Sequence, residues 1–174
     1  MKKAFIIVDF QNDFVSGSLG FPEAVTLDDK ISAKIEKYLK EDYDLIYTFD
    51  THYENYSETQ EGKKLPVPHC IKGTEGYNIY GKTASFLDLA KIKIDKNVFG
   101  SLELGEFLKK EGYDVVELCG LVSNICVISN AVIAKAALPE AKIIVDASLT
   151  ASADLSMHQK ALDVMEGLQI EVIR

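Results

Sequence analysis

Side chains able to act as acids, bases or nucleophiles stand near the ends of several short apolar segments. Asp9 and Asp50 each end one segment, Lys96 ends a third, and a fourth leads through a glycine turn toward Cys126. If these segments are parallel strands, their carboxyl ends meet at one edge of a sheet, where α/β proteins bind ligands. An aspartate in this place is equally typical of a helix cap or turn, and Asp146 is interpreted as such a turn residue.

Cys126 lies in a segment that runs from a buried strand through Gly120 into a helix, the order of elements found in a nucleophile elbow. At the start of a helix, the macrodipole and the unpaired backbone N–H groups lower the pKa of a thiol and can stabilise an oxyanion. A neighbouring lysine would lower that pKa further. Cys126 is therefore a candidate nucleophile. The alternative is a small buried hydrophobic residue, which is the interpretation given to Cys119.

Asp50, His52 and His69 could form a metal site. Asp50-x-His52 follows a strand, so both side chains lie on one rim, and His69 lies between proline-restricted segments. One carboxylate and two imidazoles suit zinc, iron or manganese. The alternative is that these loop histidines are merely solvated. Cys70 is interpreted as a packing residue because neighbours in extended chain point opposite ways, and His158 as a surface or capping residue without a role.

Short apolar segments alternate with amphipathic ones along the chain. Apolar residues recur at helical spacing in 27–39. Gly112 is expected to end the helix predicted over 102–110. A polar stretch, 50–82, is expected to be a loop-rich excursion of the kind that carries function. The predicted strands are 4–8, 45–49, 92–94, 114–119, 142–145 and 170–173, and the predicted helices are 27–39, 102–110, 123–137 and 155–166.

The predicted fold class is α/β. Several strands are continuous apolar runs, which indicates a sheet that is covered on both faces. We therefore expect one domain, residues 1–174, with three α/β/α layers around a six-stranded, mainly parallel, doubly wound sheet.

The composition restricts the partners. Hydrophobic residues make up 47% and charged residues 26% of the chain, as in ordinary globular domains. The formal charge of -8 disfavours nucleic acids and anionic membranes and favours a small neutral or cationic substrate. No segment approaches the roughly 20 apolar residues that span a bilayer. Three cysteines without a secretion signal indicate reduced thiols and a cytoplasmic protein.

Several motifs, specific only in combination, cover essentially the whole chain. They are Val8-Asp9-Phe10-Gln11-Asn12-Asp13-Phe14, Asp50-x-His52, Pro68-His69-Cys70-Ile71 with Gly73-Thr74-x-Gly76, Lys96-x-x-Phe99, and Gly120-x-x-Ser123-x-x-Cys126-Val127. On these motifs the chain resembles the isochorismatase-like cysteine hydrolases, and within them the nicotinamidase/pyrazinamidase group.

The resemblance implies a catalytic triad of Asp9, Lys96 and Cys126. It also implies an oxyanion hole made by the backbone N–H groups of Val122 and Cys126, beside a non-proline cis peptide between Leu121 and Val122. These roles agree with the chemistry of amide hydrolysis. Asp9 would accept the thiol proton and return it to the leaving amine, while Lys96 would favour the thiolate and the charged carboxylate.

The resemblance further implies a divalent metal ion, zinc, iron or manganese, held by Asp50, His52 and His69. Some relatives add an acidic fourth ligand, for which Glu61 is a better-placed candidate than Glu58. Such an ion would orient a pyridine ring and lower the pKa of bound water.

The implied reaction is the hydrolysis of nicotinamide to nicotinate and ammonia through a Cys126 thioester, with Phe14 and Leu121 in the substrate pocket. A homo-oligomer is expected from the resemblance alone. Carbamoyl or ureido compounds are alternative substrates, and vinyl-ether hydrolysis is disfavoured because that branch does not need the cysteine. A non-catalytic α/β binding domain is the alternative of a different class, but it would leave Cys126 and the loop histidines unexplained.

One departure from the family pattern concerns the substrate. Nicotinamidases carry Trp or Phe shortly before the position of His69, as part of a wall around the pyridine ring. This chain has Leu65-Pro66-Val67 there and no tryptophan. Tyr77 or Phe99 could replace that wall, so amide hydrolysis is a firmer expectation than nicotinamide specificity.

Overall fold

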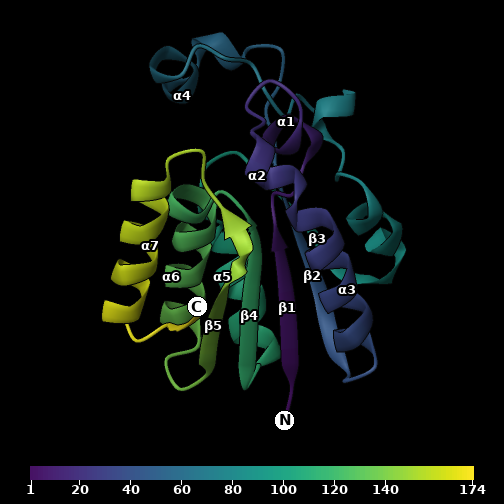
Figure 1. Cartoon of the computed structure of the whole chain (residues 1–174), viewed down its shortest axis with the longest axis vertical. Helices are drawn as coiled ribbons and strands as arrows, with labels where there is room; N and C mark the ends of the chain where they lie inside the picture. The colour runs from purple at the N-terminus through teal and green to yellow at the C-terminus, as the bar shows by residue number, and fades with distance from the viewer.

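The strands form a single sheet in the computed structural model, which describes all residues, 1–174 (Figure 1). The strands are β1 (Lys3–Val8), β2 (Tyr43–Asp50), β3 (Ala90–Lys96), β4 (Val115–Leu121), β5 (Lys142–Ala151) and β6 (Glu171–Ile173). Their order is β3-β2-β1-β4-β5-β6, and every neighbouring pair is parallel. The order changes direction between β1 and β4, so the carboxyl ends of these two strands mark the switch point at which doubly wound sheets bind ligands.

Helices cover both faces of the sheet (Figure 1). The longer helices are α3 (Leu27–Leu39), α5 (Leu102–Glu111), α6 (Ile128–Ala137) and α7 (Leu155–Gly167). Short helical segments are α1 (Asn12–Val15), α2 (Pro22–Val25), η1 (Tyr56–Glu58), α4 (Gln60–Lys64), η2 (Glu75–Tyr77), η3 (Lys82–Leu89) and η4 (Ser123–Val127). The predicted three-layer α/β/α fold with a six-stranded parallel sheet is confirmed. None of the helices combines the length and the apolar composition that a membrane-spanning segment needs.

The central strand β1 explains why the strands have continuous apolar sequences. Ala4, Ile6 and Val8 face a core cluster that includes side chains of α5, α6 and α7. Phe5 and Ile7 face a second cluster that includes side chains of α3. Because each face of the sheet has its own core, alternate residues of β1 are buried on opposite sides and none can be polar without cost.

Most predicted boundaries shift by one or two residues, and the larger differences lie in β5 and at the start of α6. The strand expected at 142–145 continues to Ala151, and its pairing with β4 is irregular. Asp146, interpreted as a turn residue, lies inside β5, where its carboxylate accepts the N–H of Ser148 at 2.9 Å in a turn-like contact. The helix expected over 123–137 begins with the wider π turn η4 before α6, since Ile128 donates its N–H to the carbonyl of Ser123.

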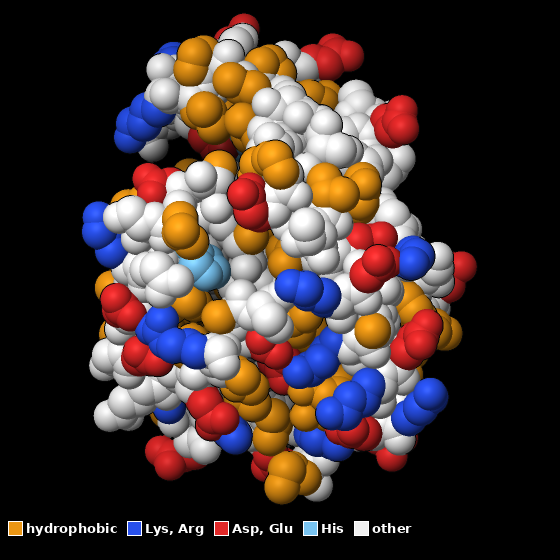
Figure 2. All heavy atoms as spheres, viewed as in Figure 1, with side chains coloured by type: hydrophobic (Ala, Val, Ile, Leu, Met, Phe, Trp, Pro, Cys, Tyr) orange, Lys and Arg blue, Asp and Glu red, His pale blue; other side chains and the backbone are white.

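The polar excursion between β2 and β3 contains more helix than expected. Its first part folds into η1 and α4, and Thr59 caps α4 by accepting the N–H of Gly62 at 3.0 Å. This part stands as an arm beyond the carboxyl ends of the strands (Figure 1). In the same view, Figure 2 shows a hollow between the arm and the body of the molecule, with hydrophobic side chains around it.

Candidate active site

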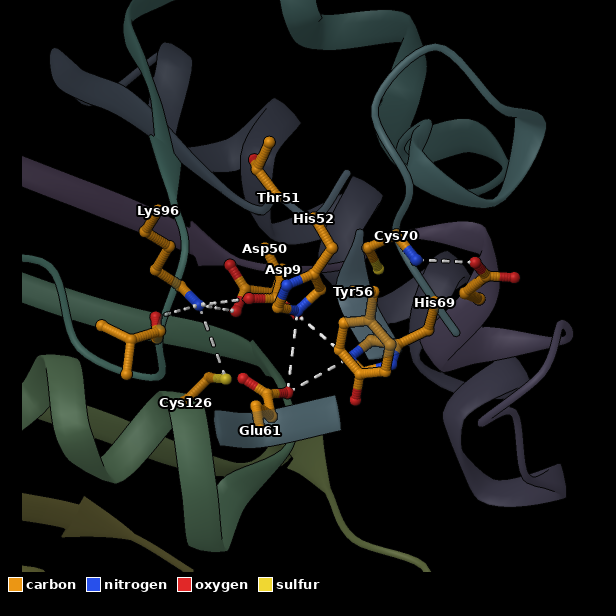
Figure 3. Close-up of polar contacts among 12 residues, drawn as sticks. Asp9, Asp50, Thr51, His52, Tyr56, Glu61, His69, Cys70, Lys96 and Cys126 are labelled. Atoms are coloured by element: carbon orange, nitrogen blue, oxygen red, sulfur yellow. Dashed lines mark hydrogen bonds and ion pairs between the residues drawn. The ribbon is translucent and has the colours of Figure 1, made fainter. Parts of the chain in front are cut away.

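Asp9, Lys96 and Cys126 meet at the carboxyl edge of the sheet (Figure 3). The Nζ atom of Lys96 lies 2.5 Å from a carboxylate oxygen of Asp9, 3.6 Å from Sγ of Cys126 and 3.5 Å from an oxygen of Asp50. It also donates to the carbonyl of Val98 at 3.1 Å. The structure therefore brings together the three residues proposed as a triad, all of them buried.

The order of the strands places these side chains. Asp9 follows β1, Cys126 follows the adjacent β4, and Lys96 ends β3 on the other side of β2. Thr48 of β2 holds Asp9 in place through two contacts. Its hydroxyl donates to Asp9 Oδ1 at 2.6 Å, and its carbonyl accepts the Asp9 N–H at 3.2 Å. Asp9 has φ +45, so the chain leaves the line of the strand at this residue.

Burial and neighbouring charges determine the pKa values of Asp9 and Lys96. Burial raises the pKa of Asp9, the charge of Lys96 opposes this, and the charge of Asp50 adds to it. Burial disfavours the charged form of Lys96, but Asp9, Cys126 and Asp50 outweigh this effect and raise its pKa. Lys96 therefore stays a cation, and Asp9 is a stronger base than an ordinary aspartate.

Cys126 titrates differently from the expectation based on its place at a helix start. Burial raises the pKa of its thiol well above the usual value, the charge of Asp9 adds to this, and Lys96 opposes it. The reason for the difference is that the side chain is only 4% exposed, so loss of solvation outweighs the favourable helix end. The resting group is a thiol, and attack on a carbonyl requires a base that accepts its proton.

Asp50, His52, Glu61 and His69 direct their donor atoms at a common point (Figure 3). Their ligand atoms all lie within 4.8 Å of one another. Oδ2 of Asp50 is 3.0 Å from Nε2 of His52 and 3.3 Å from Nε2 of His69. Oε1 of Glu61 is 3.6 and 3.5 Å from the same two nitrogens. Two imidazoles and two carboxylates around one point are a donor set suited to zinc, iron or manganese.

Contacts outside this group hold the ligands in place. Nδ1 of His69 lies 2.7 Å from the carbonyl of Val67, which leaves Nε2 facing the group. The side-chain amide of Gln11 donates to the carbonyl of Asp50 at 2.9 Å and accepts its N–H at 2.8 Å. Gln11 thereby ties the end of β1 to the end of β2.

Cys70 is fully buried and lies outside the metal-binding group, in agreement with its interpretation as a packing residue. The geometric reason given for it was wrong, because the chain is not extended there: Cys70 has φ +47. Its N–H donates to a carboxylate oxygen of Asp13 at 2.8 Å, which fixes the segment next to His69.

A cavity of about 280 Å³ joins Cys126 to the metal-binding group. Its lining includes Cys126, Asp50, Glu61 and His69 and contains no lysine or arginine. The other lining residues are Phe14, Leu19, Phe21, Leu65, Phe99, Val122, Asn124, Ile125, Ser152, Ala153 and Asp154. The cavity is therefore mostly apolar, with the thiol of Cys126 and three residues of the metal-binding group on its wall.

Leu121, expected in the substrate pocket, does not line this cavity. Its side chain is fully buried in the core cluster on the α3 side of the sheet, because it is the last residue of β4 and points into that face. The next residue, Val122, lines the cavity instead. The cis peptide expected between Leu121 and Val122 is present.

Aromatic side chains line the cavity, although the chain has no Trp or Phe shortly before His69. Phe14 lines the cavity, with its ring centroid 5.4 Å from that of His69. Phe99 lines it as well, whereas Tyr77, the other suggested replacement, stacks on Phe49 outside it. Phe21 was missed by sequence reasoning, and no local pattern around it could have placed it there, since it enters from the segment before α2.

Two further residues near Cys126 were also missed. Asn130 of α6 donates to the carbonyls of Cys126 at 2.8 Å and Phe99 at 3.0 Å, and accepts the N–H of Ser101 at 3.0 Å. An amide on the buried side of an apolar helix was the available signal, because buried amides need partners. His158, interpreted as a surface or capping residue, is in fact 9% exposed, since its face of α7 packs toward η4.

Comparison with known proteins identifies the family. The isochorismatase domain model matches residues 3–174. A Bacillus subtilis protein of the isochorismatase family, PncA, is 30% identical over 146 residues, which cover 76% of this chain and 78% of that one. The nicotinamidase/pyrazinamidase of Mycobacterium tuberculosis is 27% identical over 194 residues, with 98% of each chain covered. The pyrazinamidase/nicotinamidase structure from Streptococcus mutans matches with a TM-score of 0.88 at 29% identity, covering 99% of this chain and 100% of that one. The chain belongs to the isochorismatase family.

Proposed function

We propose that this protein is a metal-dependent cysteine amidohydrolase that converts nicotinamide to nicotinate and ammonia. The observation that carries the proposal is that one cavity holds the thiol of Cys126 beside the metal-binding residues Asp50, Glu61 and His69. Relatives named nicotinamidase, from a bacterium and from yeast, each align with 98% of the chain, which supports an amide as the substrate.

The first half of the proposed reaction forms a thioester. Asp9 accepts the proton of the Cys126 thiol, and the sulfur attacks the amide carbonyl carbon. The backbone N–H groups of Val122 and Cys126 are proposed to stabilise the resulting oxyanion. Asp9 then returns the proton to the departing nitrogen, so that the C–N bond breaks and ammonia leaves. Lys96 stays charged throughout and stabilises the carboxylate of Asp9.

The second half regenerates the thiol. Water attacks the thioester carbonyl while Asp9 accepts one of its protons. The C–S bond breaks, and Asp9 returns the proton to the sulfur of Cys126. The carboxylic acid product is thereby released. Proton transfer in both directions suits a carboxylate whose pKa is raised by burial, because it binds a proton more strongly than an ordinary aspartate does.

The four residues that face one point would hold a divalent zinc, iron or manganese ion. The fit rests on their contacts: one carboxylate oxygen of Asp50 lies within 3.3 Å of two imidazole nitrogens, an arrangement that a shared cation would stabilise. When bound, such an ion supplies Lewis-acid chemistry, orients a ring nitrogen and lowers the pKa of water. His52, His69 and Glu61 would keep it at the wall of the substrate cavity.

The cavity favours an uncharged aromatic amide over a ureido acid. Phe14, Phe21 and Phe99 offer ring surfaces. The carboxylates on its wall would repel a substrate carboxylate, and no lysine or arginine lines the cavity to pair with one. Nicotinamide and pyrazinamide satisfy both conditions, whereas carbamoyl amino acids do not.

The test is the release of ammonia from nicotinamide, pyrazinamide and a carbamoyl amino acid, with zinc, iron or manganese added. The variants are Cys126→Ala and the matched control Cys119→Ala, which removes a buried thiol from β4 away from the cavity. We expect release from the two aromatic amides, at least about 10³-fold less in Cys126→Ala, and little change in Cys119→Ala.

Three results would contradict parts of this proposal. Ammonia release that persists in Cys126→Ala would refute the nucleophile. Release from the carbamoyl compound alone would show that the substrate is a ureido compound and not nicotinamide. No release from any amide, with each metal present, would favour a non-catalytic binding domain.

A further inference from the structure

His158 is the histidine that the metal-binding group does not use, and it is buried in α7. Its Nδ1 lies 2.9 Å from the hydroxyl oxygen of Ser123, which is itself completely buried. Buried polar groups are costly without partners, and these two satisfy each other. This buried hydrogen bond therefore connects α7 to η4, and we ask what it contributes to the site.

Ser123 is the first residue of η4, the turn that carries Cys126. The carbonyl of Ser123 accepts the N–H of Ile128, and the carbonyl of Val122 accepts those of Ile125 and Val127. Two N–H groups are proposed to bind the oxyanion, those of Val122 and Cys126. Along the chain, one precedes Ser123 and the other follows it. A displacement of Ser123 would move one donor relative to the other.

His158 cannot reach the substrate itself. It is absent from the lining of the cavity that holds Cys126 and from the metal-binding group. It lies instead along a separate groove of about 210 Å³ formed by α7, β5 and the start of α3. The hydrogen bond to Ser123 is therefore the contact that links His158 to the turn carrying Cys126.

We propose that His158 is a positioning residue: its Nδ1 holds the hydroxyl of Ser123 and so keeps η4 in the geometry at which both oxyanion donors meet one oxygen. The inference rests on the proposed amidohydrolase function. Donor placement matters because a misplacement of about 1 Å can cost roughly 10²-fold in rate. A helix that packs against the turn supplies this rigidity better than a solvated loop does.

The charge state of His158 agrees with this role. Burial lowers the pKa of the imidazole, and the positive charge of Arg174 lowers it further. Glu23 and Lys30 share the neighbouring groove with the ring. A neutral ring allows Nδ1 to accept the proton of the Ser123 hydroxyl.

The test is a double-mutant cycle of His158→Phe, Ser123→Ala and the double variant, with kcat and KM measured for ammonia release from nicotinamide. Each single change is expected to lower kcat by about 10- to 100-fold with KM within about twofold, because an oxyanion hole acts on the transition state. The double variant is expected to be no slower than the slower single variant, since both changes remove one contact.

Two more variants separate positioning from general packing. His158→Asn keeps a polar atom near the place of Nδ1 and is expected to regain part of kcat. Ala161→Gly weakens the same helix at a buried position but leaves the hydrogen bond between His158 and Ser123 in place, so it is expected to lower Tm but leave kcat within about twofold. If His158→Phe does not fold, His158→Leu, which also removes the hydrogen-bonding nitrogen, completes the cycle with Ser123→Ala.

Fully independent effects in the double variant, or an equal loss of kcat in Ala161→Gly, would overturn the inference. If wild-type protein releases no ammonia from any amide, the proposed function has failed. The rate at which iodoacetamide alkylates Cys126 is then measured in the variants of the double-mutant cycle. Cys126→Ala gives the background, because Cys70 and Cys119 are fully buried. His158→Phe and Ser123→Ala are then expected to change the alkylation rate by the same factor, and unchanged rates in both would refute the positioning role.

Discussion

Lys96 lies buried between two carboxylates and a thiol, and its charge affects how each of them titrates. Its positive charge opposes the rise in the pKa of Asp9 and in that of Cys126. The ion pair with Asp9 is almost free of solvent, so it is screened far less than a surface pair. Lys96 therefore favours the charged form of both Asp9 and Cys126, which is the role that the proposed mechanism gives it.

Replacing Lys96 by methionine should remove this control. We expect Lys96→Met to lower kcat/KM for nicotinamide by about 10²–10⁴-fold, since Asp9 becomes protonated and can no longer accept the thiol proton. The pKa of Cys126 should rise further without the cation, so alkylation by iodoacetamide at a fixed pH should be slower than in wild type. Ammonia release and the rate of alkylation measure the two effects.

Lys93→Met is the matched control, because Lys93 is an exposed lysine on the same strand. It should behave like wild type in both assays. A Lys96→Met enzyme as active as Lys93→Met would remove Lys96 from the catalytic machinery.

The segment between β3 and α5 connects the triad to the cavity wall, because it follows Lys96 and contains Phe99. Two contacts hold its far end. The hydroxyl of Ser101 accepts the N–H of Leu104 and caps α5, and the backbone N–H of Ser101 donates to Asn130. The cap contact involves only the start of α5, whereas Asn130 also donates to the carbonyl of Cys126.

Ser101→Ala should therefore lower stability with little effect on catalysis. We expect the free energy of unfolding to fall by about 1 kcal/mol, the usual cost of a lost N-cap, with kcat within about twofold because the backbone contact to Asn130 remains. Urea unfolding and ammonia release measure the two quantities. Ser156→Ala, an exposed serine of α7, is the control for the substitution itself. A loss of stability no larger than in that control would show that the cap contributes nothing.

The whole molecule is connected through the metal-binding group. Asp50 ends β2, His52 and His69 come from the two sides of the excursion, and Glu61 comes from α4 in the projecting arm. An ion bound by all four would link the arm to the sheet, and it would bind the folded chain far better than the unfolded one. Metal binding and folding stability should therefore be coupled.

Added zinc should raise the stability of the wild-type protein, by about 2.7 kcal/mol at a free concentration 100 times Kd. Glu61→Ala should reduce the increase at the same zinc concentration, because one ligand is lost. Glu58→Ala, which removes an exposed acid from the same arm, should keep it. Thermal unfolding with and without zinc measures the effect, and an equal zinc response in both variants would exclude Glu61 as a ligand.

Local patterns predicted most elements well. The helix expected over 27–39 has these same limits in the structure, because Leu27, Ile31 and Ile35 make one apolar stripe and pack into one core. Gly112 ends α5 with φ +66, a conformation in which glycine lacks the usual steric cost. Strand limits were less accurate, as for β5, since pairing with a neighbour rather than local sequence decides where a strand stops.

The sequence by itself determined which residues could form the site. Asp9, Asp50, Lys96 and Cys126 stand at or beyond strand ends, and parallel strands must bring those ends to one edge. Only the tertiary structure decided how they behave. The pKa of Cys126 is raised rather than lowered because burial depends on what packs over the thiol, which no local pattern contains. The pairing of His158 with Ser123 and the aromatic cavity wall likewise depend on distances between segments far apart in the chain.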